Sequence, residues 1–355
     1  MTDQASPGAF MAGRDIPEVR TMSGVTLEQF RDDILPRSEP VLMKGFVGHW
    51  PAVTAGRQSA DAMIDYVSRF DARRPVETIY GGPEIAGRYF YNEDLTGLNF
   101  DRRPAIISDS LQEIARLRHE EAPGSVYIQS TPMHANLPGF AEANPIDVLP
   151  PVIEPRIWMG NRLSVQTHFD LSENIACVVA GKRRFTLFPP EQTPNLYVGP
   201  FELTLAGPPV SLVRLDHPDL ETYPRFAEAM DHAQSAVLEP GDALFIPYFW
   251  WHHVQSLADF NVLINYWWND TSRQLASPFD AMLHAILAFR DMPPHQQKAW
   301  RMMLGQYVFQ DNGDPVAHLP PHSRGALGPH TPQQRNQLKA QLAQNLAMQA
   351  GLIPR

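Results

Sequence analysis

The chain has 355 residues and a mass of 40.0 kDa, enough for one large domain with extensions or for two smaller domains. Apolar residues make up 43% and charged residues 19%, which excludes a disordered chain, and the single cysteine excludes a disulfide framework or a multi-cysteine zinc site. A net charge of −10 without a basic run argues against nucleic-acid binding through phosphates. Because no long apolar window and no signal-peptide core occur, we expect a cytoplasmic protein that does not enter a membrane.

The N-terminal part is predicted to mix helices and strands. Residues 1–20 are expected to form a flexible tail, after which Thr26 and Gln29 have the spacing of a helix cap. Helices are expected over residues 59–69 and 111–119, because apolar residues recur there at three- and four-residue spacing. Short apolar runs predict strands over residues 40–46, 76–91 and 125–130.

From residue 156 to residue 270 the pattern is almost purely that of β-structure. Short apolar runs alternate with turn residues, and the prolines, 34 in the whole chain, are scattered singly or in pairs between short elements. Eight short strands predict a sandwich or jelly roll, in which two sheets protect each other's edges. They are residues 156–159, 164–169, 174–180, 184–188, 236–238, 243–246, 253–257 and 261–267.

The C-terminal part returns to helices. Residues 278–290 and 295–307 have helical periodicity and carry apolar stripes, and residues 331–349 read as a capped helix rich in alanine and glutamine. We therefore expect a catalytic domain over residues 21–270, with its jelly-roll core at about 156–270. A C-terminal helical extension is expected over residues 277–355.

Two histidine patterns are the best candidates for a catalytic centre. The sequence has no phosphate-binding loop, no Gly-x-Gly-x-x-Gly, no His-Glu-x-x-His and no Gly-x-Ser-x-Gly. His168 and Asp170 are two apart on a predicted strand, so both side chains point to one face. With His252 or His253 from a later strand they would form a two-histidine, one-carboxylate set, which suits Fe(II). The pair alone is more often a half-buried histidine beside a solvated aspartate than a metal site.

The sequence around these residues resembles the cupin-like branch of the JmjC hydroxylases. The resemblance is dense over residues 166–190 and 239–268, and the second segment holds a Gly-Asp turn, a buried strand and the run Trp250-Trp251-His252. It extends over residues 40–270, and the family includes the asparaginyl hydroxylase that inhibits hypoxia-inducible factor. The resemblance implies a mainly β protein, a double-stranded β-helix (jelly roll) with N-terminal α/β decoration and C-terminal helices.

For the function, the resemblance implies a dioxygenase with Fe(II), 2-oxoglutarate and O2. His168, Asp170 and His252 would be the catalytic iron ligands, His252 rather than His253 because the family pattern selects the first histidine. The reaction would hydroxylate a C–H bond of a protein side chain or a small molecule and release succinate and CO2. The alternative is a cupin that binds a metal or ligand without oxygenase chemistry, as a sensor or a partner-binding module. Asparagine as the target is only an analogy to one relative.

The resemblance also indicates residues that would hold 2-oxoglutarate. The family places a lysine fifteen residues after the first histidine ligand, where this chain has Arg183. Arginine can bind a carboxylate through two hydrogen bonds, and the neighbouring Lys182 is the alternative cation. Family residues near the co-substrate correspond to Tyr127, Asn265 and Asn174, and Asn174 is expected to point to the same strand face as His168.

Substrate contacts and a dimer are implied more loosely. Gln129 corresponds to a family glutamine that faces the substrate, and Trp267 is the candidate for a wall of the substrate pocket among four tryptophans that otherwise suit a core. Relatives dimerise through C-terminal helices, so the C-terminal apolar stripes predict a homodimer. The substrate itself, a protein or a small molecule, is not identified by the sequence.

Overall fold

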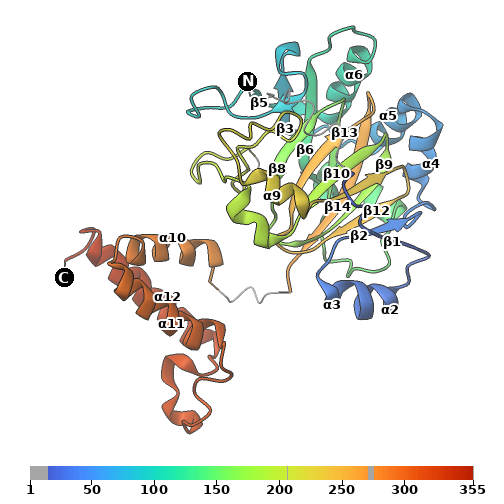
Figure 1. The fold of residues 1–355 in the computed structure, drawn as a ribbon. Helices are drawn as coiled ribbons and strands as arrows, with labels where there is room; N and C mark the ends of the chain where they lie inside the picture. Colours follow the sequence, from blue (N-terminus) through green and yellow to red (C-terminus); the bar gives the residue numbers. More distant parts are fainter. Residues whose placement is uncertain (1–14, 206, 271–275, 355) are drawn as a thin grey trace. The chain divides into compact units, whose positions relative to one another are not determined.

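A computed structural model describes residues 15–205, 207–270 and 276–354 of the protein (Figure 1). Its internal contacts divide the chain between Asn269 and Asp270 into two units, and each unit is described by itself. Most of the predicted tail, residues 1–14, lies outside the described residues. The backbone of Pro17 and Val19 is hydrogen-bonded to Ser235, and Val19 is buried, so the predicted tail does not extend to residue 20.

Two sheets form the first unit. The nine-stranded sheet has, in spatial order, β1 (Arg20–Ser23), β2 (Val41–Lys44), β12 (Ala243–Ile246), β9 (Glu173–Ala180), β14 (Asn261–Trp268), β7 (Pro155–Gly160), β6 (Ser125–Pro132), β3 (Pro75–Gly81) and β5 (Asp101–Ile106). The five-stranded sheet has β11 (Gln234–Leu238), β10 (Arg183–Phe188), β13 (Trp251–Ser256), β8 (Ser164–His168) and β4 (Arg88–Tyr89).

The eight strands predicted between residues 156 and 267 are all present, and the chain passes back and forth between the sheets as it builds them. β7, β9, β12 and β14 lie in the nine-stranded sheet, whereas β8, β10, β11 and β13 lie in the five-stranded sheet. Such strand exchange between two facing sheets is the arrangement of a jelly roll. The predicted mainly β, cupin-type fold is confirmed.

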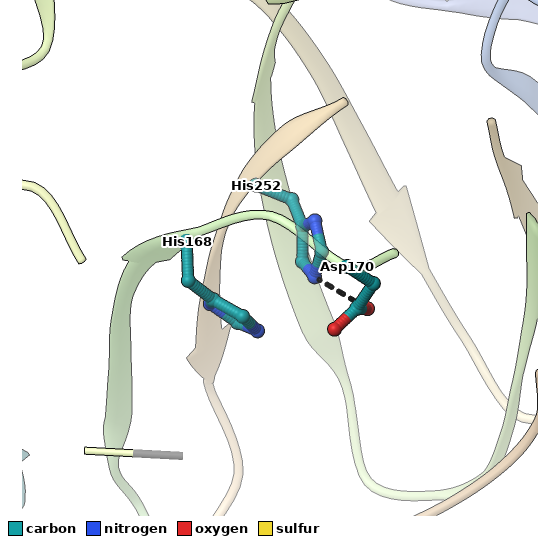
Figure 2. A group of neighbouring side chains, drawn as sticks. All are labelled: His168, Asp170 and His252. Carbon is teal, nitrogen blue, oxygen red and sulfur yellow. Dashed lines mark ion pairs between the residues drawn. The ribbon is translucent and has the colours of Figure 1, made fainter. Parts of the chain in front are cut away.

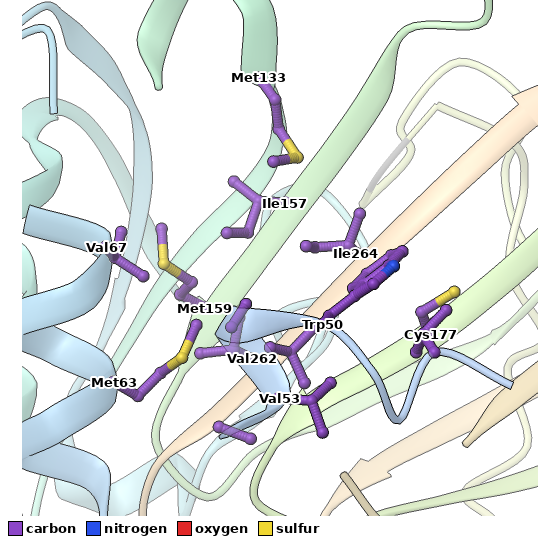
Figure 3. Close-up of a cluster of buried hydrophobic side chains, with 14 of the residues drawn as sticks. Trp50, Val53, Met63, Val67, Met133, Ile157, Met159, Cys177, Val262 and Ile264 are labelled. Carbon is purple, nitrogen blue, oxygen red and sulfur yellow. The ribbon is translucent and has the colours of Figure 1, made fainter. Parts of the chain in front are cut away.

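Alternation along the central strands sorts side chains between two cores. On β9, Ile175 and Cys177 belong to the cluster on the outer face of the nine-stranded sheet, while Ala176 and Val178 belong to the cluster between the sheets. β14 alternates in the same way. Figure 3 shows the outer cluster, in which Trp50 and side chains of the N-terminal helices lie against the sheet. The inner face is thereby left to line a cavity between the sheets.

Helices decorate the first unit mainly before the jelly roll. They are α2 (Leu27–Gln29), α3 (Leu35–Arg37), α4 (Pro51–Gln58), α5 (Ala60–Ser68), α6 (Ile107–Leu117), α7 (Met133–Asn136), α8 (Phe140–Ala143) and α9 (Phe226–Asp231). The predicted cap is confirmed, because the Thr26 side chain accepts from the Gln29 backbone N–H and the Gln29 side chain accepts from the Thr26 backbone N–H.

The elements of this unit that were not predicted include β1, β5, α4 and α9 and the short helices α3, α7 and α8. β5 contains three charged residues and Pro104, a composition that does not suggest a strand. It lies at the edge of its sheet, where one side of the strand needs no hydrogen-bond partner and proline is tolerated. Its pairing with β3 therefore forms despite the weak sequence signal.

The second unit consists of α10 (Pro278–Phe289), α11 (Pro294–Leu304) and α12 (Pro332–Gln349), and Thr331 and Gln334 form the predicted cap of α12. None of the three helices has a buried residue among those described. Leu287 is 83% and Met302 69% exposed, so apolar side chains of this unit lie open within the chain as described. Among the described helices of the protein, none combines the length and apolar character needed to span a bilayer.

Candidate metal centre and co-substrate cavity

Three potential metal ligands meet where the two-histidine, one-carboxylate set was predicted (Figure 2). His168 is the last residue of β8, Asp170 follows two residues later, and His252 lies opposite His168 on the neighbouring β13. One ligand atom from each side chain lies within 4.8 Å of the others. His252 Nε2 and Asp170 Oδ2 are 3.5 Å apart, and the imidazole centroids of the two histidines are 4.3 Å apart.

Backbone carbonyls fix the orientation of both imidazoles. His168 Nδ1 lies 2.8 Å from the carbonyl oxygen of Gln166, and His252 Nδ1 lies 3.0 Å from that of Trp250. Each Nδ1 thus carries the proton and donates it to a carbonyl, which leaves each Nε2 lone pair for a metal. Burial, together with the neighbouring His168, lowers the pKa of His252 to about 4, so this ring is neutral at pH 7. The donor set fits Fe(II).

His253 takes no part in this group. Its neighbour His252 faces the cavity, and in a strand the next side chain must face the other way. His253 Nδ1 lies 3.4 Å from the Thr167 hydroxyl, and burial lowers the pKa of His253 to about 4. The geometry therefore brings His252, and not His253, to His168 and Asp170.

A cavity between the two sheets contains the three ligands and most of the predicted co-substrate residues. The five-stranded sheet and the chain just after β8 contribute Val165, His168, Asp170, Arg183, Phe185, His252 and Val254. The nine-stranded sheet contributes Tyr127, Gln129, Trp158, Asn174, Ala176, Leu263, Asn265 and Trp267. Polar groups therefore converge on a partly apolar space, as in binding sites for small ligands.

Arg183 is a buried cation for which the described residues provide no acidic partner. It is 2% exposed, donates to the hydroxyl of Tyr127, and has a long 3.5 Å contact to the carbonyl oxygen of Trp158. Burial lowers its pKa and the contact with Tyr127 raises it, yet guanidinium stays charged at pH 7. In the part of the chain that is described, no carboxylate pairs with Arg183, and its Nε atom is buried without a hydrogen-bond partner. Such a charge calls for an anionic ligand.

The other predicted cation lies elsewhere. Lys182 is on the protein surface, where its Nζ is 3.1 Å from Glu239 Oε1, and its side chain is 48% exposed. The structure therefore brings Arg183, and not Lys182, into the cavity. Asn174 lies on β9, the strand predicted over residues 174–180, and it faces the cavity. A turn of the chain after Asp170 separates β9 from β8, the strand that ends at His168.

Gln129 lies two residues after Tyr127 on β6, so both side chains face the cavity, and an irregularity of the strand follows Gln129 directly. Between Ile128 and Thr131 the pairing with β7 shifts, and Ser130 takes a left-handed backbone conformation with φ of 46°. Arg156 Nη1 donates to the Ser130 carbonyl at 2.8 Å and stabilises this bulge. Bulges of this kind re-aim side chains next to active sites.

The chain matches the cupin-like domain family over residues 27–274. It belongs to this family. The cupin-like chain is 27% identical over 278 residues to the tRNA wybutosine-synthesizing protein 5 of Gallus gallus, covering 73% of this chain and 80% of that protein. It is 26% identical over 259 residues to the Jumonji C domain-containing protein 5 of Drosophila melanogaster, and the match covers 72% of this chain and 60% of that protein. It is 25% identical over 256 residues to the lysine-specific demethylase 8 of Xenopus tropicalis, and the match covers 69% of this chain and 51% of that protein. The predicted cupin-like JmjC relationship is confirmed.

One polar residue of the cupin-like cavity was not predicted. Trp158 alternates with Ile157 and Met159 on β7 and was treated as part of a plain apolar run. Its Nε1 lies 2.6 Å from Asn265 Oδ1. The alternation itself was the available signal, because an inward-facing indole in a strand needs an acceptor for its N–H.

Proposed function

We propose that this cupin-like protein is an Fe(II)- and 2-oxoglutarate-dependent dioxygenase that hydroxylates a C–H bond of a protein side chain or a small molecule. When bound, the iron and 2-oxoglutarate would allow O2 to react: one oxygen atom would enter succinate, with release of CO2, and the other would enter the hydroxylated product. Family membership and the likeness to Jumonji C proteins support an oxygenase. The observation that carries the proposal is the pairing, in one cavity, of a two-histidine, one-carboxylate group with a buried, uncompensated arginine.

The spacing of these two features suits a short dicarboxylate. His252 pairs with Leu187 on β10, and Arg183 lies four residues earlier on the same strand, roughly 13 Å along the backbone. The side chains of His252 and Arg183 both line the cavity. An acid chelating at His168, Asp170 and His252 could thus direct its other carboxylate to Arg183 and the Tyr127 hydroxyl. In this role the Arg183 guanidinium would provide the positive charge, and a hydrogen bond from the Tyr127 hydroxyl would orient the carboxylate.

The remaining cavity residues would serve binding and exclusion of water. Phe185, Val254 and Leu263 present apolar surface between the metal ligands and Arg183. Gln129 is the proposed substrate contact, since it lines the cavity on the same face of β6 as Tyr127. The names of the relatives refer to tRNA wybutosine synthesis and to lysine demethylation, so the shared domain alone does not select a substrate.

Anaerobic titration of the wild-type protein with Fe(II) in the presence of 2-oxoglutarate is expected to produce the visible absorption band of an iron complex with a 2-oxo acid. The donor set and Arg183 predict saturation with one equivalent of each. The measurement requires no knowledge of the substrate. Iron binding without any band would instead favour the metal-binding cupin without oxygenase chemistry.

We also propose that two copies associate through the C-terminal helices, because α10 and α11 carry apolar side chains that nothing within their own unit buries. Light scattering at micromolar concentration should give about twice the 40.0 kDa of one chain. Leu287→Glu places a charge on an 83% exposed leucine and should shift the mass towards one chain. Gln344→Glu adds the same charge at an exposed polar position of α12 and should leave the dimer intact. A 40 kDa wild-type particle would contradict the proposal.

A further inference from the structure

Two indoles of the nine-stranded sheet donate hydrogen bonds to polar groups of the cavity. Trp267 Nε1 lies 3.1 Å from Asp170 Oδ2, and Trp158 Nε1 lies 2.6 Å from Asn265 Oδ1. The two rings meet edge to face, with centroids 5.6 Å apart. We propose that both are positioning residues: Trp267 orients the metal-binding carboxylate, and Trp158 orients two amides that face the co-substrate. This inference rests on the proposed function.

Trp267 acts on Asp170. This aspartate lies beyond the end of β8, and Figure 2 shows its carboxylate beside His252, with one oxygen directed towards that ring. A carboxylate has two oxygens and can turn about its Cβ–Cγ bond. The indole N–H can only donate, so it binds one carboxylate oxygen and restricts rotation of the carboxylate about that bond. The orientation that the metal needs is therefore set before the metal binds, as partners of metal ligands commonly do.

Trp158 acts through a chain of two amides. Because an indole N–H can only donate, the Asn265 atom that it reaches must be the oxygen. The Asn265 amide nitrogen then points the other way, and it lies 3.2 Å from Asn174 Oδ1. With its oxygen occupied in this way, Asn174 must turn its own NH2 group elsewhere. One donor that cannot be reversed thus fixes both amide orientations.

The NH2 group of Asn174 faces the cavity at the end where the metal would bind. Asn174 lines the cavity and is 5% exposed, and across the described residues its Nδ2 atom has no hydrogen-bond acceptor. Its backbone lies opposite Trp267, whose indole reaches Asp170. Two N–H donors there suit the carboxylate of an acid that chelates the metal. A reversed Asn174 would present its carbonyl oxygen instead and repel that carboxylate.

The test compares three Trp→Phe variants, each of which removes an indole N–H. Fe(II) affinity is measured by competition with a chelator, and 2-oxoglutarate affinity by titration of the visible band at saturating Fe(II). Trp267→Phe should weaken Fe(II) binding by about tenfold. Trp158→Phe should leave Fe(II) binding within about twofold and weaken 2-oxoglutarate by about tenfold. Trp50→Phe is the control, since Trp50 is fully buried and donates to Pro145 O away from the cavity.

The outcomes separate this inference from the function on which it rests. If the wild type binds both ligands and the two cavity variants behave like Trp50→Phe, the positioning roles are wrong and the proposed function stands. A wild type that binds neither ligand would overturn the proposed function and this inference with it. Should Trp158→Phe fail to fold, Asn174→Leu removes the donors that Trp158 is inferred to aim. That variant must then show the same loss of 2-oxoglutarate affinity, and unchanged affinity would overturn the role of Trp158.

Discussion

Replacing Asp170 by alanine is expected to reduce 2-oxoglutarate turnover by more than about 100-fold, because losing even an outer partner of a metal ligand costs about 10–100-fold. The change leaves only the two imidazoles of His168 and His252, too few ligands to hold Fe(II) firmly at the site. The measurement is succinate formation in the presence of Fe(II) and O2, together with Fe(II) affinity.

Asp259→Ala provides the matched control for Asp170→Ala. Asp259 is a surface carboxylate that is 64% exposed and pairs with Arg162, so its removal should leave both readouts unchanged. Full turnover in Asp170→Ala would rule out the assignment of the metal centre. Equal losses in the two variants would show that the effect comes from a general loss of folded protein.

Arg183→Met is expected to lower the affinity for 2-oxoglutarate by about 100-fold, since loss of one partner of a buried charge pair costs about 2–5 kcal/mol. In the ligand-free protein the same change removes a buried cation that no carboxylate of the described residues pairs with. The free energy of unfolding of ligand-free Arg183→Met should therefore equal that of the ligand-free wild type or exceed it by about 1 kcal/mol. Affinity and stability are thus predicted to change in opposite directions. Titration of the visible band and chemical denaturation measure the two.

Lys182→Met separates the two neighbouring cations. Lys182 is half-exposed and paired with Glu239, so an exposed ion pair is lost, which is worth about 0–1 kcal/mol, and 2-oxoglutarate affinity should be unchanged. A loss of affinity in Lys182→Met but not in Arg183→Met would reverse the assignment. An unfolding free energy of Arg183→Met well below that of the wild type would show that Arg183 is a structural residue.

The jelly roll and the metal centre were predictable because their signals are local. Short, nearly continuous apolar runs define β9 and β14, and the spacing of His168 and Asp170 places both on one face whatever the rest of the chain does. Edge strand β5 was not predictable in this way, since its charged and proline-containing sequence becomes a strand only when β3 is present to pair with it.

Other features of the site depend on contacts between distant residues. Whether Arg183 or Lys182 enters the cavity is decided by the register of β10 against β13, which a run of three cations does not reveal. The bulge at Ser130 and the contact between Trp158 and Asn265 join residues far apart in the sequence. The hydrogen bond that orients the Asn174 amide comes from Asn265 on another strand, so the sequence around Asn174 could not reveal it.

The passage of the chain back and forth between the sheets has a consequence for how ligands affect the protein. His168, His252 and Arg183 belong to the small sheet, whereas Tyr127, Asn174 and the two indoles belong to the large one. A molecule bound by residues of both sheets links the two sheets across the cavity. Opening fluctuations that part the layers must then first release it, so their frequency should fall as occupancy rises. The two sheets of the ligand-free jelly roll would therefore separate more often, and binding of the metal and co-substrate would suppress these openings.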